Sequence, residues 1–356
     1  MASRTYPLKV KAIDTNTVDT KTISFEIPTH LKAEYDYEPG QYLTIEVTIN
    51  GKKERRAYSM SSSPLTDVYP AVTVKRLAGG LVSNYLNDEI SVGSELSVLP
   101  PYGEFTIDLN PEKKAHYFLF GAGSGITPLL SMIKSILQIE PESKVSLLYG
   151  NRQKDSIIFY NELNQLRGEN TDRFNIIYAL SQPQGLWFGE TGRIDEAKVK
   201  NVLDTHAGDA LPKQYLICGP SDMIKLVEET LLSSGISERF IKKEFFVLPT
   251  KEKEESKDAA SNANEDYEVT IKVDRASHTI KVGSNETILD AALDANIDVP
   301  FSCMSAACST CRAKLESGTV SMEDDEILSK KEKSQNYILS CQAHPTSDGV
   351  VVNFDV

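Results

Sequence analysis

The sequence predicts a multidomain protein in which an antiparallel β domain, an α/β domain and a small α+β domain follow one another. Three observations support this prediction. Short alternating segments fill residues 1–107, apolar runs alternate with helical stretches over 113–247, and a strand pair precedes a helix and four cysteines in 267–356. A chain of 356 residues has room for two or three such domains.

The first domain is predicted over residues 1–107. Segments such as KTISFEI and QYLTIEVTI alternate apolar and polar residues and are separated by Pro, Gly and Asn. Regular short strands with turn signals between them are typical of an antiparallel barrel or sandwich.

The second domain is predicted over residues 113–247. HYFLFG, KVSLLYG, FNIIYAL and QYLICG are apolar runs of strand length, and helical stretches lie between them. Strands that alternate with helices indicate βαβ units, with a parallel sheet that is buried on both faces.

Residues 248–266 are predicted to be a flexible linker, because almost none of them is apolar and the segment cannot bury enough surface to order itself. Residues 267–356 then begin with an alternating pair, YEVTIKV and HTIKV, and a helix over ETILDAALDAN. This pattern predicts a third, small α+β domain.

The charge balance narrows the classes of partner. The net charge is −13, which argues against nucleic acid and anionic membranes as partners. No apolar run reaches the ~18 residues of a membrane helix, and the first residues lack the apolar block of a secretion signal. We therefore expect a cytoplasmic protein. The five histidines show no metal spacing and are expected at surface or turn positions.

Four of the five cysteines form a spaced set. Cys303, Cys308, Cys311 and Cys341 follow the pattern C-x4-C-x2-C-x29-C. This spacing is the plant-type pattern for a [2Fe–2S] cluster, with one loop supplying three thiolates and a distant residue the fourth. The alternative is a zinc site with four thiolates, although zinc sites usually show paired C-x2-C units.

Residues 267–356 resemble a plant-type ferredoxin domain on these cysteines. The resemblance implies a β-grasp fold and an electron-transfer cluster. The family usually has glycine at the third position between the first two cysteines, where this chain has Ala306. Alanine keeps the backbone N–H but disfavours a positive φ.

A flavin-binding pattern lies in the first domain. Arg56-Ala57-Tyr58-Ser59 stands in a predicted strand, where Arg56 can pair with phosphate, the Tyr58 ring can lie on an isoalloxazine and Ser59 can bond the polar atoms of the flavin. Alone, these four residues fit an ordinary barrel strand equally well. The residues that would continue along the flavin are Val74, Lys75 and Arg76, and those of the helix start that would hold a pyrophosphate are Gly80, Leu81, Val82 and Ser83.

Two turns of the second domain suit a dinucleotide. Gly121-Ala122-Gly123-Ser124-Gly125-Ile126-Thr127-Pro128 joins a buried strand to a helix, and Cys218-Gly219-Pro220 joins another strand to the next helix. Ligands in open α/β sheets bind beyond the carboxyl ends of the strands, where both turns are expected. For the first turn alone, a tight connection without a ligand remains the simpler interpretation.

Together these patterns resemble the ferredoxin–NADP reductase superfamily. The resemblance implies FAD in the barrel and a nicotinamide site in which Thr127 faces the flavin and Cys218 lies near the hydride-donating carbon. It also implies that Glu244 and Phe246 approach the flavin, and Arg152 and Ser181 are candidates for the adenosine half of the cofactor. Glu244 joins Thr127 and Cys218 as a candidate catalytic residue. NADPH or NADH is the expected donor.

The order of the modules indicates the reaction. NAD(P)H delivers two electrons as hydride and a [2Fe–2S] cluster accepts one at a time, so a flavin that can do both must stand between them. The whole chain resembles reductase components of multicomponent oxygenases, most strongly those that serve phenylacetyl-CoA epoxidation. The matching segments are Gly121–Pro128, Tyr149–Arg152, Cys218–Pro220, Asp290–Leu293 and Tyr337–Ala343.

The resemblance implies a di-iron oxygenase, the phenylacetyl-CoA epoxidase, as electron acceptor in phenylacetate degradation. One alternative is a reductase for another acceptor, such as a Rieske dioxygenase, a hydroxylase or a desaturase. Another is a non-catalytic interaction module whose four cysteines hold zinc.

Overall fold

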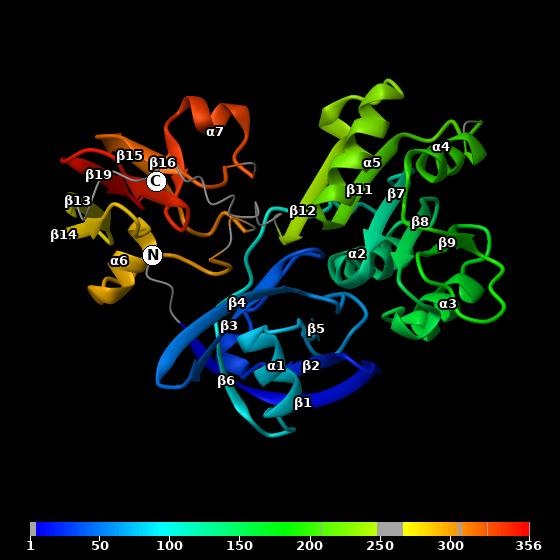
Figure 1. The fold of residues 1–356 in the computed structure, drawn as a ribbon. Helices are drawn as coiled ribbons and strands as arrows, with labels where there is room; N and C mark the ends of the chain where they lie inside the picture. The colour runs from blue at the N-terminus through cyan, green and yellow to red at the C-terminus, as the bar shows by residue number, and fades with distance from the viewer. Residues whose placement is uncertain are drawn as a thin grey trace. The chain divides into compact units, whose positions relative to one another are not determined.

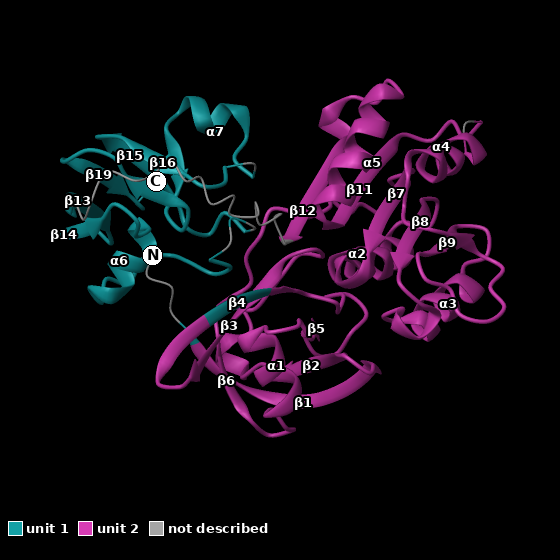
Figure 2. Cartoon of the chain, viewed as in Figure 1, with its two compact units in different colours: residues 1–5, 55–57, 247–356 teal, residues 6–54, 58–246 magenta. Residues whose placement is uncertain are grey.

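The computed structural model describes residues 5–206, 208–247, 266–304, 306, 308–325 and 327–355 (Figure 1). The chain forms two compact units, which Figure 2 distinguishes by colour. One contains residues 6–54 and 58–246, and the other contains residues 1–5, 55–57 and 247–356. Nearly all of the predicted linker, residues 248–265, lies outside the described residues. Over the described ranges, no helix has both the length and the apolar character needed to cross a membrane.

The predicted antiparallel domain is a six-stranded sheet in the order β4-β3-β6-β1-β2-β5. Its strands are β1 (Tyr6–Thr17), β2 (Thr20–Glu26), β3 (Tyr42–Ile49), β4 (Lys52–Ser59), β5 (Ala71–Lys75) and β6 (Glu95–Val98). Met60, directly after β4, bridges to Val72 of β5. Because β4 and β5 are the two ends of the strand order, this bridge closes the sheet into the predicted barrel. The alternating apolar residues, such as Phe25, Leu43 and Ile45, fill its interior.

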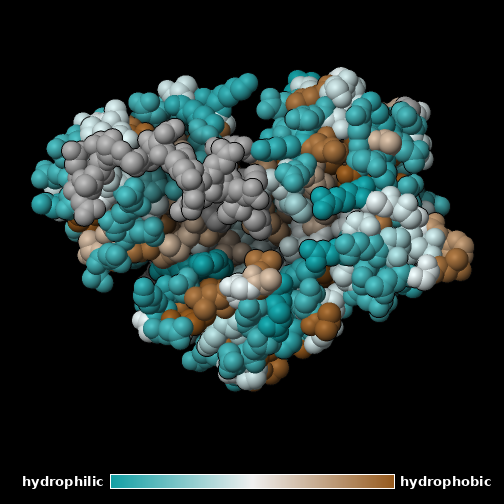
Figure 3. Space-filling view, viewed as in Figure 1, coloured by the Kyte–Doolittle hydropathy of each residue, from teal (hydrophilic) through white to brown (hydrophobic). Residues whose placement is uncertain are grey.

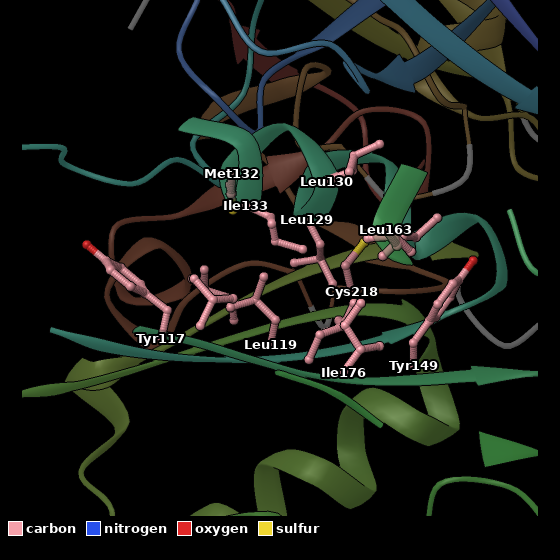
Figure 4. Packing of buried hydrophobic residues seen from close by; sticks show 14 of the residues in the cluster. Tyr117, Leu119, Leu129, Leu130, Met132, Ile133, Tyr149, Leu163, Ile176 and Cys218 are labelled. Carbon is pink, nitrogen blue, oxygen red and sulfur yellow. The ribbon is translucent and has the colours of Figure 1, made fainter. Parts of the chain in front are cut away.

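The second domain is a parallel sheet, as predicted, and its strands lie in the order β10-β9-β8-β7-β11-β12. Its strands are β7 (His116–Ala122), β8 (Lys144–Asn151), β9 (Phe174–Leu180), β10 (Glu190–Thr191), β11 (Lys213–Pro220) and β12 (Ile241–Val247). The helices between them are α2 (Ile126–Ile139), α3 (Tyr160–Glu169), α4 (Glu196–Thr205) and α5 (Ser221–Ser233). Figure 4 shows the packed core of this domain, in which Cys218 lies among apolar side chains.

The last residues assigned to the barrel from sequence pack into the α/β core. Phe105 and Ile107 are buried there together with Met132 of α2. Gly40 of the barrel has a φ of +104°, and a Cβ at this position would lie 2.4 Å from Cε of Met132. Barrel and α/β sheet are therefore in close contact, without a spacer between them.

The small domain is a five-stranded sheet in the order β14-β13-β19-β15-β17 with the helix α6 (Ile288–Asp294). Strands β13 (Asp266–Val273) and β14 (Ala276–Gly283) are the predicted pair, antiparallel with Val269 opposite Ile280. The other strands are β15 (Arg312–Ser317), β17 (Tyr337–Leu339) and β19 (Val350–Asn353), which runs parallel to β13. The strands β16 (Val320–Met322) and β18 (Ala343–Pro345) pair separately, and α7 (Lys330–Ser334) precedes β17. This arrangement agrees with the α+β prediction.

Exposed apolar side chains are distributed over several loops. On the face drawn in Figure 3, hydrophobic colour appears in separate patches among hydrophilic residues. The most exposed examples include Val18, Val68, Leu186 and Phe188. Single exposed apolar residues are ordinary in globular proteins.

The expectation that all five histidines lie at surface or turn positions is wrong for His116. Its side chain is 1% exposed, on β7, where its Nδ1 lies 3.1 Å from Oδ2 of Asp209 and its Nε2 lies 2.9 Å from Oγ of Ser146. The ring also stacks on Phe118 with centroids 4.2 Å apart. Hydrogen bonds to both ring nitrogens make this burial possible.

The buried His116 predicts an acid-sensitive α/β domain. Burial, the neighbouring His206 and Lys144 lower the pKa of His116 from 6.5 to about 4, although Asp209 opposes the shift. Because the folded pKa lies below the unfolded one, the stabilisation is complete above about pH 6.5 and is lost as the pH falls toward 4. The shift corresponds to about 3 kcal/mol. Thermal unfolding at pH 7.5 and pH 5 should show a smaller loss of Tm for His116→Gln than for the wild type. The exposed His278→Gln is the control, and equal losses in all three proteins would contradict this assignment.

Candidate cofactor sites

The four predicted cluster cysteines come together in the small domain. Cys303, Cys308 and Cys311 lie in the loop between α6 and β15, and Cys341 lies between β17 and β18. The Cys311 thiol donates to Sγ of Cys341 at 3.2 Å, and the backbone N–H of Cys303 donates to Sγ of Cys308 at 3.4 Å. All five cysteines of the chain are among the described residues, and none is in a disulfide.

These thiols lie close enough to hydrogen-bond one another, which fits a metal-binding set. Hydrogen bonding with Cys341 and burial raise the pKa of Cys311, while the same hydrogen bond lowers the pKa of Cys341. Hydrogen bonding with Cys303 and burial likewise raise the pKa of Cys308. Four sulfur donors on one short loop and one distant turn are the ligand set of a [2Fe–2S] cluster, so these residues fit that group.

The departure at Ala306 has a visible conformational consequence. Ala306 has a φ of +54° and is 1% exposed. Met304 and Ser309 in the same loop also have positive φ values, +55° and +50°. The loop therefore adopts the left-handed turns that glycine usually supplies, at a cost of about 1 kcal/mol for a non-glycine residue.

The pattern Arg56–Ser59 lies on β4, the strand at one end of the strand order. The next residue, Met60, forms the bridge to β5. Ser59 is 5% exposed and its hydroxyl donates to Oε2 of Glu244 at 3.0 Å. Arg56, Ala57 and Tyr58 are half-buried on the same strand. The hydrogen bond between Ser59 and Glu244 joins residues 185 apart in sequence and brings a barrel strand to the end of the α/β domain.

The residues that would continue along the flavin are either buried or half-buried. Val74 and Val82 belong to the barrel core, so only their backbone is available to a ligand. Lys75 is half-buried on β5. Arg76 forms two hydrogen bonds of 2.6 Å with the carboxylate of Asp88, which fixes its guanidinium against α1 (Leu81–Asp88).

The start of α1 offers the predicted anion seat. Gly80 is the N-cap residue, Gly79 has a φ of +72°, and the Ser83 hydroxyl accepts from the backbone N–H of Leu77 at 3.2 Å. Oδ1 of Asn84 is buried and has no hydrogen-bond partner within the described ranges. A buried polar atom of this kind, beside the free N–H groups of a helix start, fits a site for a flavin pyrophosphate. Leu81 is 45% exposed at the same helix start.

The two turns of the α/β domain meet in space. Gly121 of β7 lies beside Cys218 of β11 in the parallel ladder. A Cβ on Gly125 would lie 2.2 Å from the carbonyl oxygen of Cys218, so only glycine fits there. Gly219 has a φ of +157° and would place a Cβ 3.2 Å from the backbone nitrogen of Ala122. The close contact of two glycine turns at the carboxyl ends of adjacent strands fits a nicotinamide site.

The nicotinamide turn is held by hydrogen bonds. The Tyr149 hydroxyl donates to the carbonyl of Gly123 at 2.8 Å, and the Thr127 hydroxyl donates to the carbonyl of Ser124 at 3.0 Å. Thr127 and Pro128 are buried in the first turn of α2, and Pro220 ends β11 directly before α5. Gly123 has a φ of +55° and open space where a Cβ would stand.

Two of the three candidate catalytic residues, Cys218 and Glu244, interact electrostatically. Burial raises the pKa of Glu244 to about 8, although the hydrogen bond from Ser59 opposes the rise. Burial raises the pKa of Cys218 well above its usual range, and the charge of Glu244 adds to this rise. Glu244 is thus mostly protonated at neutral pH. Phe246, two residues later, packs against the α/β core and is partly exposed.

The adenosine candidates lie at the ends of neighbouring strands. Arg152 directly follows β8 and is exposed, and Ser181 directly follows β9. Hydrogen bonds join the two ends: Ser181 N–H donates to the carbonyl of Asn151 at 3.0 Å, and Gln182 N–H donates to that of Arg152 at 2.8 Å. The structure therefore brings Arg152 and Ser181 together, at the same sheet edge as the glycine turns.

Comparison with known families supports the three-module organisation. Residues 7–107 match the oxidoreductase FAD-binding domain, residues 119–229 match the oxidoreductase NAD-binding domain, and residues 271–346 match the 2Fe-2S iron-sulfur cluster binding domain. The last match favours an iron–sulfur cluster over zinc at the four cysteines.

Curated relatives match nearly the whole chain. A component of the 1,2-phenylacetyl-CoA epoxidase of Escherichia coli is 34% identical, with 98% of each chain covered. The ferredoxin reductase component of 3-ketosteroid-9-alpha-monooxygenase from Rhodococcus rhodochrous is 35% identical, covering 99% of this chain and 97% of the relative. The solved structure of phthalate dioxygenase reductase shares the fold, with a TM-score of 0.62, 23% identity and 98% of each chain covered.

Proposed function

Because the chain belongs to the ferredoxin reductase-type family that fuses FAD-binding, NAD-binding and [2Fe–2S] domains, we propose that it delivers electrons to the di-iron oxygenase that epoxidises phenylacetyl-CoA. The chain is an oxidoreductase, the reductase component of a multicomponent oxygenase. Its electrons pass from NAD(P)H through FAD to the [2Fe–2S] cluster. We further propose that it works in the cytoplasm, in phenylacetate degradation.

The observation that carries the proposed function is the convergence of Ser59, Glu244 and Cys218. Ser59 comes from the flavin strand, and Cys218 and Glu244 come from the nicotinamide domain. A bound flavin accepts an electron pair as hydride and releases electrons singly. The residues supply its surroundings: Arg56 and the start of α1 would hold phosphate, Tyr58 would cover the ring, and the turn Gly123–Gly125 would place the nicotinamide near Cys218.

The proposed acceptor rests on the match to the component of the Escherichia coli epoxidase over nearly the full length of both chains. A similar identity links the chain to a 3-ketosteroid monooxygenase reductase, so the acceptor must be tested directly. In a reconstituted assay, the protein with NAD(P)H should support epoxidation of phenylacetyl-CoA by the epoxidase oxygenase component. Turnover with a 3-ketosteroid oxygenase but none with the epoxidase would overturn the proposed acceptor.

The electron donor is proposed to be NADPH in preference to NADH. The exposed guanidinium of Arg152 and the hydroxyl of Ser181 lie at adjoining strand ends, where a 2′-phosphate on the adenosine ribose would find a cation and a donor. The residue after Ser181 is Gln182, which carries no charge. Arg152 therefore supplies the main electrostatic preference.

Glu244 predicts a pH profile for flavin reduction. Its pKa of about 8 keeps the carboxyl neutral at pH 7, and a negative charge appears beside the flavin site as the pH rises above 8. Because a carboxylate there opposes the arrival of hydride, the limiting rate of reduction should fall by about tenfold toward pH 9.5. Glu244→Gln should remove this fall, as measured by stopped-flow absorbance with saturating NAD(P)H. An unchanged inflection near pH 8 in the variant would assign the titration to another group.

A further inference from the structure

We propose that Ser131, Lys134 and Ser135 of α2 are positioning residues that fix the nicotinamide turn relative to the flavin strand. The inference rests on the proposed function, in which a hydride passes from NAD(P)H to oxidised FAD and leaves NAD(P)+ and two-electron-reduced FAD. These three residues touch neither cofactor site directly. They act through the helix that carries the turn.

Two buried serine contacts join α2 to the segment that follows β4. The Ser131 hydroxyl donates to the carbonyl of Ser62 at 2.6 Å. The hydroxyls of Ser135 and Ser63 are 2.8 Å apart and share a hydrogen bond. Ser63, Ser131 and Ser135 are all fully buried, and Ser62 is 4% exposed. Hydrogen bonds in such surroundings are directional, and breaking one leaves a buried polar group without a partner.

A lysine extends this connection to a third element. Nζ of Lys134 lies 3.1 Å from Oδ2 of Asp67 and 2.5 Å from Oε1 of Glu162 on α3. Oδ2 of Asp67 also accepts from the backbone N–H of Ser63 at 2.7 Å. The side chain of Lys134 is 12% exposed, whereas those of Asp67 and Glu162 are 32% and 38% exposed, so both ion pairs are partly open to water. Lys134 thus ties the barrel loop to the α/β domain on both sides of α2.

The spacing places this connection close to both cofactor sites. Positions 131, 134 and 135 lie on one face of a helix, and Thr127 is one turn before Ser131 on the same face. Four residues of helix span about 6 Å, so the connection lies about one turn from the nicotinamide turn. On the barrel side, Ser62 is three residues after Ser59, which bonds Glu244. On each side, therefore, only a few residues separate these contacts from the cofactor site.

Apolar packing alone would hold the barrel and the α/β domain together without fixing the orientation of α2 relative to the barrel. Met132, between the positioning residues, packs close to Gly40 of the barrel and supplies such a contact. The polar contacts on its two sides define one orientation of α2. Because hydride transfer depends steeply on the distance between donor carbon and flavin ring, a small change of register should slow it more than it weakens binding.

The test compares flavin reduction by NAD(P)H in full-length holoprotein. We expect Lys134→Met and Ser131→Ala each to lower the limiting rate of flavin reduction, and the double variant to lower it by about tenfold. The dissociation constant for NAD(P)H should change less than about twofold, because the groups that bind the cofactor remain in place. The long-wavelength charge-transfer absorbance between reduced flavin and NAD(P)+ should weaken in parallel.

Controls separate positioning from general stability. Gln138→Met changes an exposed residue of the same helix and should keep the wild-type rate and charge-transfer band. Lys134→Arg keeps the cation and should restore most of the rate. If Ser131→Ala binds less flavin, the more exposed Lys134→Met carries the test. Wild-type rate and charge-transfer absorbance in Lys134→Met would overturn the inference.

Failure of the inference is distinguishable from failure of the proposed function. A wild-type protein whose flavin takes no electrons from NAD(P)H would contradict both. Normal flavin reduction in every variant would overturn only the positioning role. The identity of the oxygenase does not enter this half-reaction, so a different acceptor leaves the inference unaffected.

Discussion

Cys308→Ser should abolish NAD(P)H-driven reduction of cytochrome c while sparing the reduction of ferricyanide. Cys308 contacts both the Cys303 backbone and the Thr310 hydroxyl, at the centre of the cluster loop. Replacing the thiolate of Cys308 by a hydroxyl would remove one of the four sulfur bonds that we propose hold the cluster. Mutating a residue that only hydrogen-bonds to a metal ligand already lowers metal affinity or activity by about 10–100-fold. The loss of a ligand itself should therefore lower the rate of cytochrome c reduction by at least about 100-fold.

The two acceptors separate the modules. Ferricyanide can take electrons from the flavin directly, so its reduction reports the barrel and the α/β domain alone. Ser321→Ala, at an exposed position of the same domain, is the control and should reduce both acceptors normally. Loss of both activities in Cys308→Ser, or retention of both, would contradict the modular path of the electrons.

Gly125→Ala should disable electron uptake from NAD(P)H. The added Cβ would stand 2.2 Å from the carbonyl oxygen of Cys218 and 2.8 Å from the nitrogen of Gly219, which are backbone atoms that cannot turn aside. The turn before α2 must then move away from the turn before α5. Since a displacement of about 1 Å can cost about 100-fold in rate, flavin reduction by NAD(P)H should fall by at least that factor.

A chemical reductant tests whether the damage is local. Dithionite should still reduce flavin and cluster in Gly125→Ala, because neither of those sites contains the turn. Gly168→Ala, on the exposed face of α3 where a Cβ meets nothing within 4 Å, is the matched control and should behave as the wild type. Near-normal reduction of Gly125→Ala by NAD(P)H would argue that the two glycine turns do not form the nicotinamide site.

The features that the sequence predicted well are local ones. The first three cysteines, the glycine turns and the alternation of strands and helices each lie within a short window, and the structure has each of them. The strand pair of the small domain was also predicted, because both strands and their turn are contiguous in sequence. Local patterns of this kind need no knowledge of tertiary contacts.

The features that were missed depend on contacts between distant residues. The sequence marks Ser59 and Glu244 separately as flavin-site candidates, but nothing in it indicates that they bond each other. The sequence likewise does not indicate the contact of Ser131 with Ser62, because a serine within a helix is ordinarily interpreted as a neutral position. His116 was wrongly expected at the surface, since its burial depends on Asp209 and Ser146, which follow it by 93 and 30 positions.

A single chain passes electrons from a hydride carrier through a flavin to an iron–sulfur cluster. Anaerobic titration of the purified holoprotein with NAD(P)H, followed by visible absorbance and electron paramagnetic resonance, tests it most directly. We expect bleaching of a bound flavin together with the signal of a reduced [2Fe–2S] centre that is absent in Cys308→Ser. A colourless protein that contains zinc, or a flavin that bleaches while the cluster stays oxidised, would contradict it.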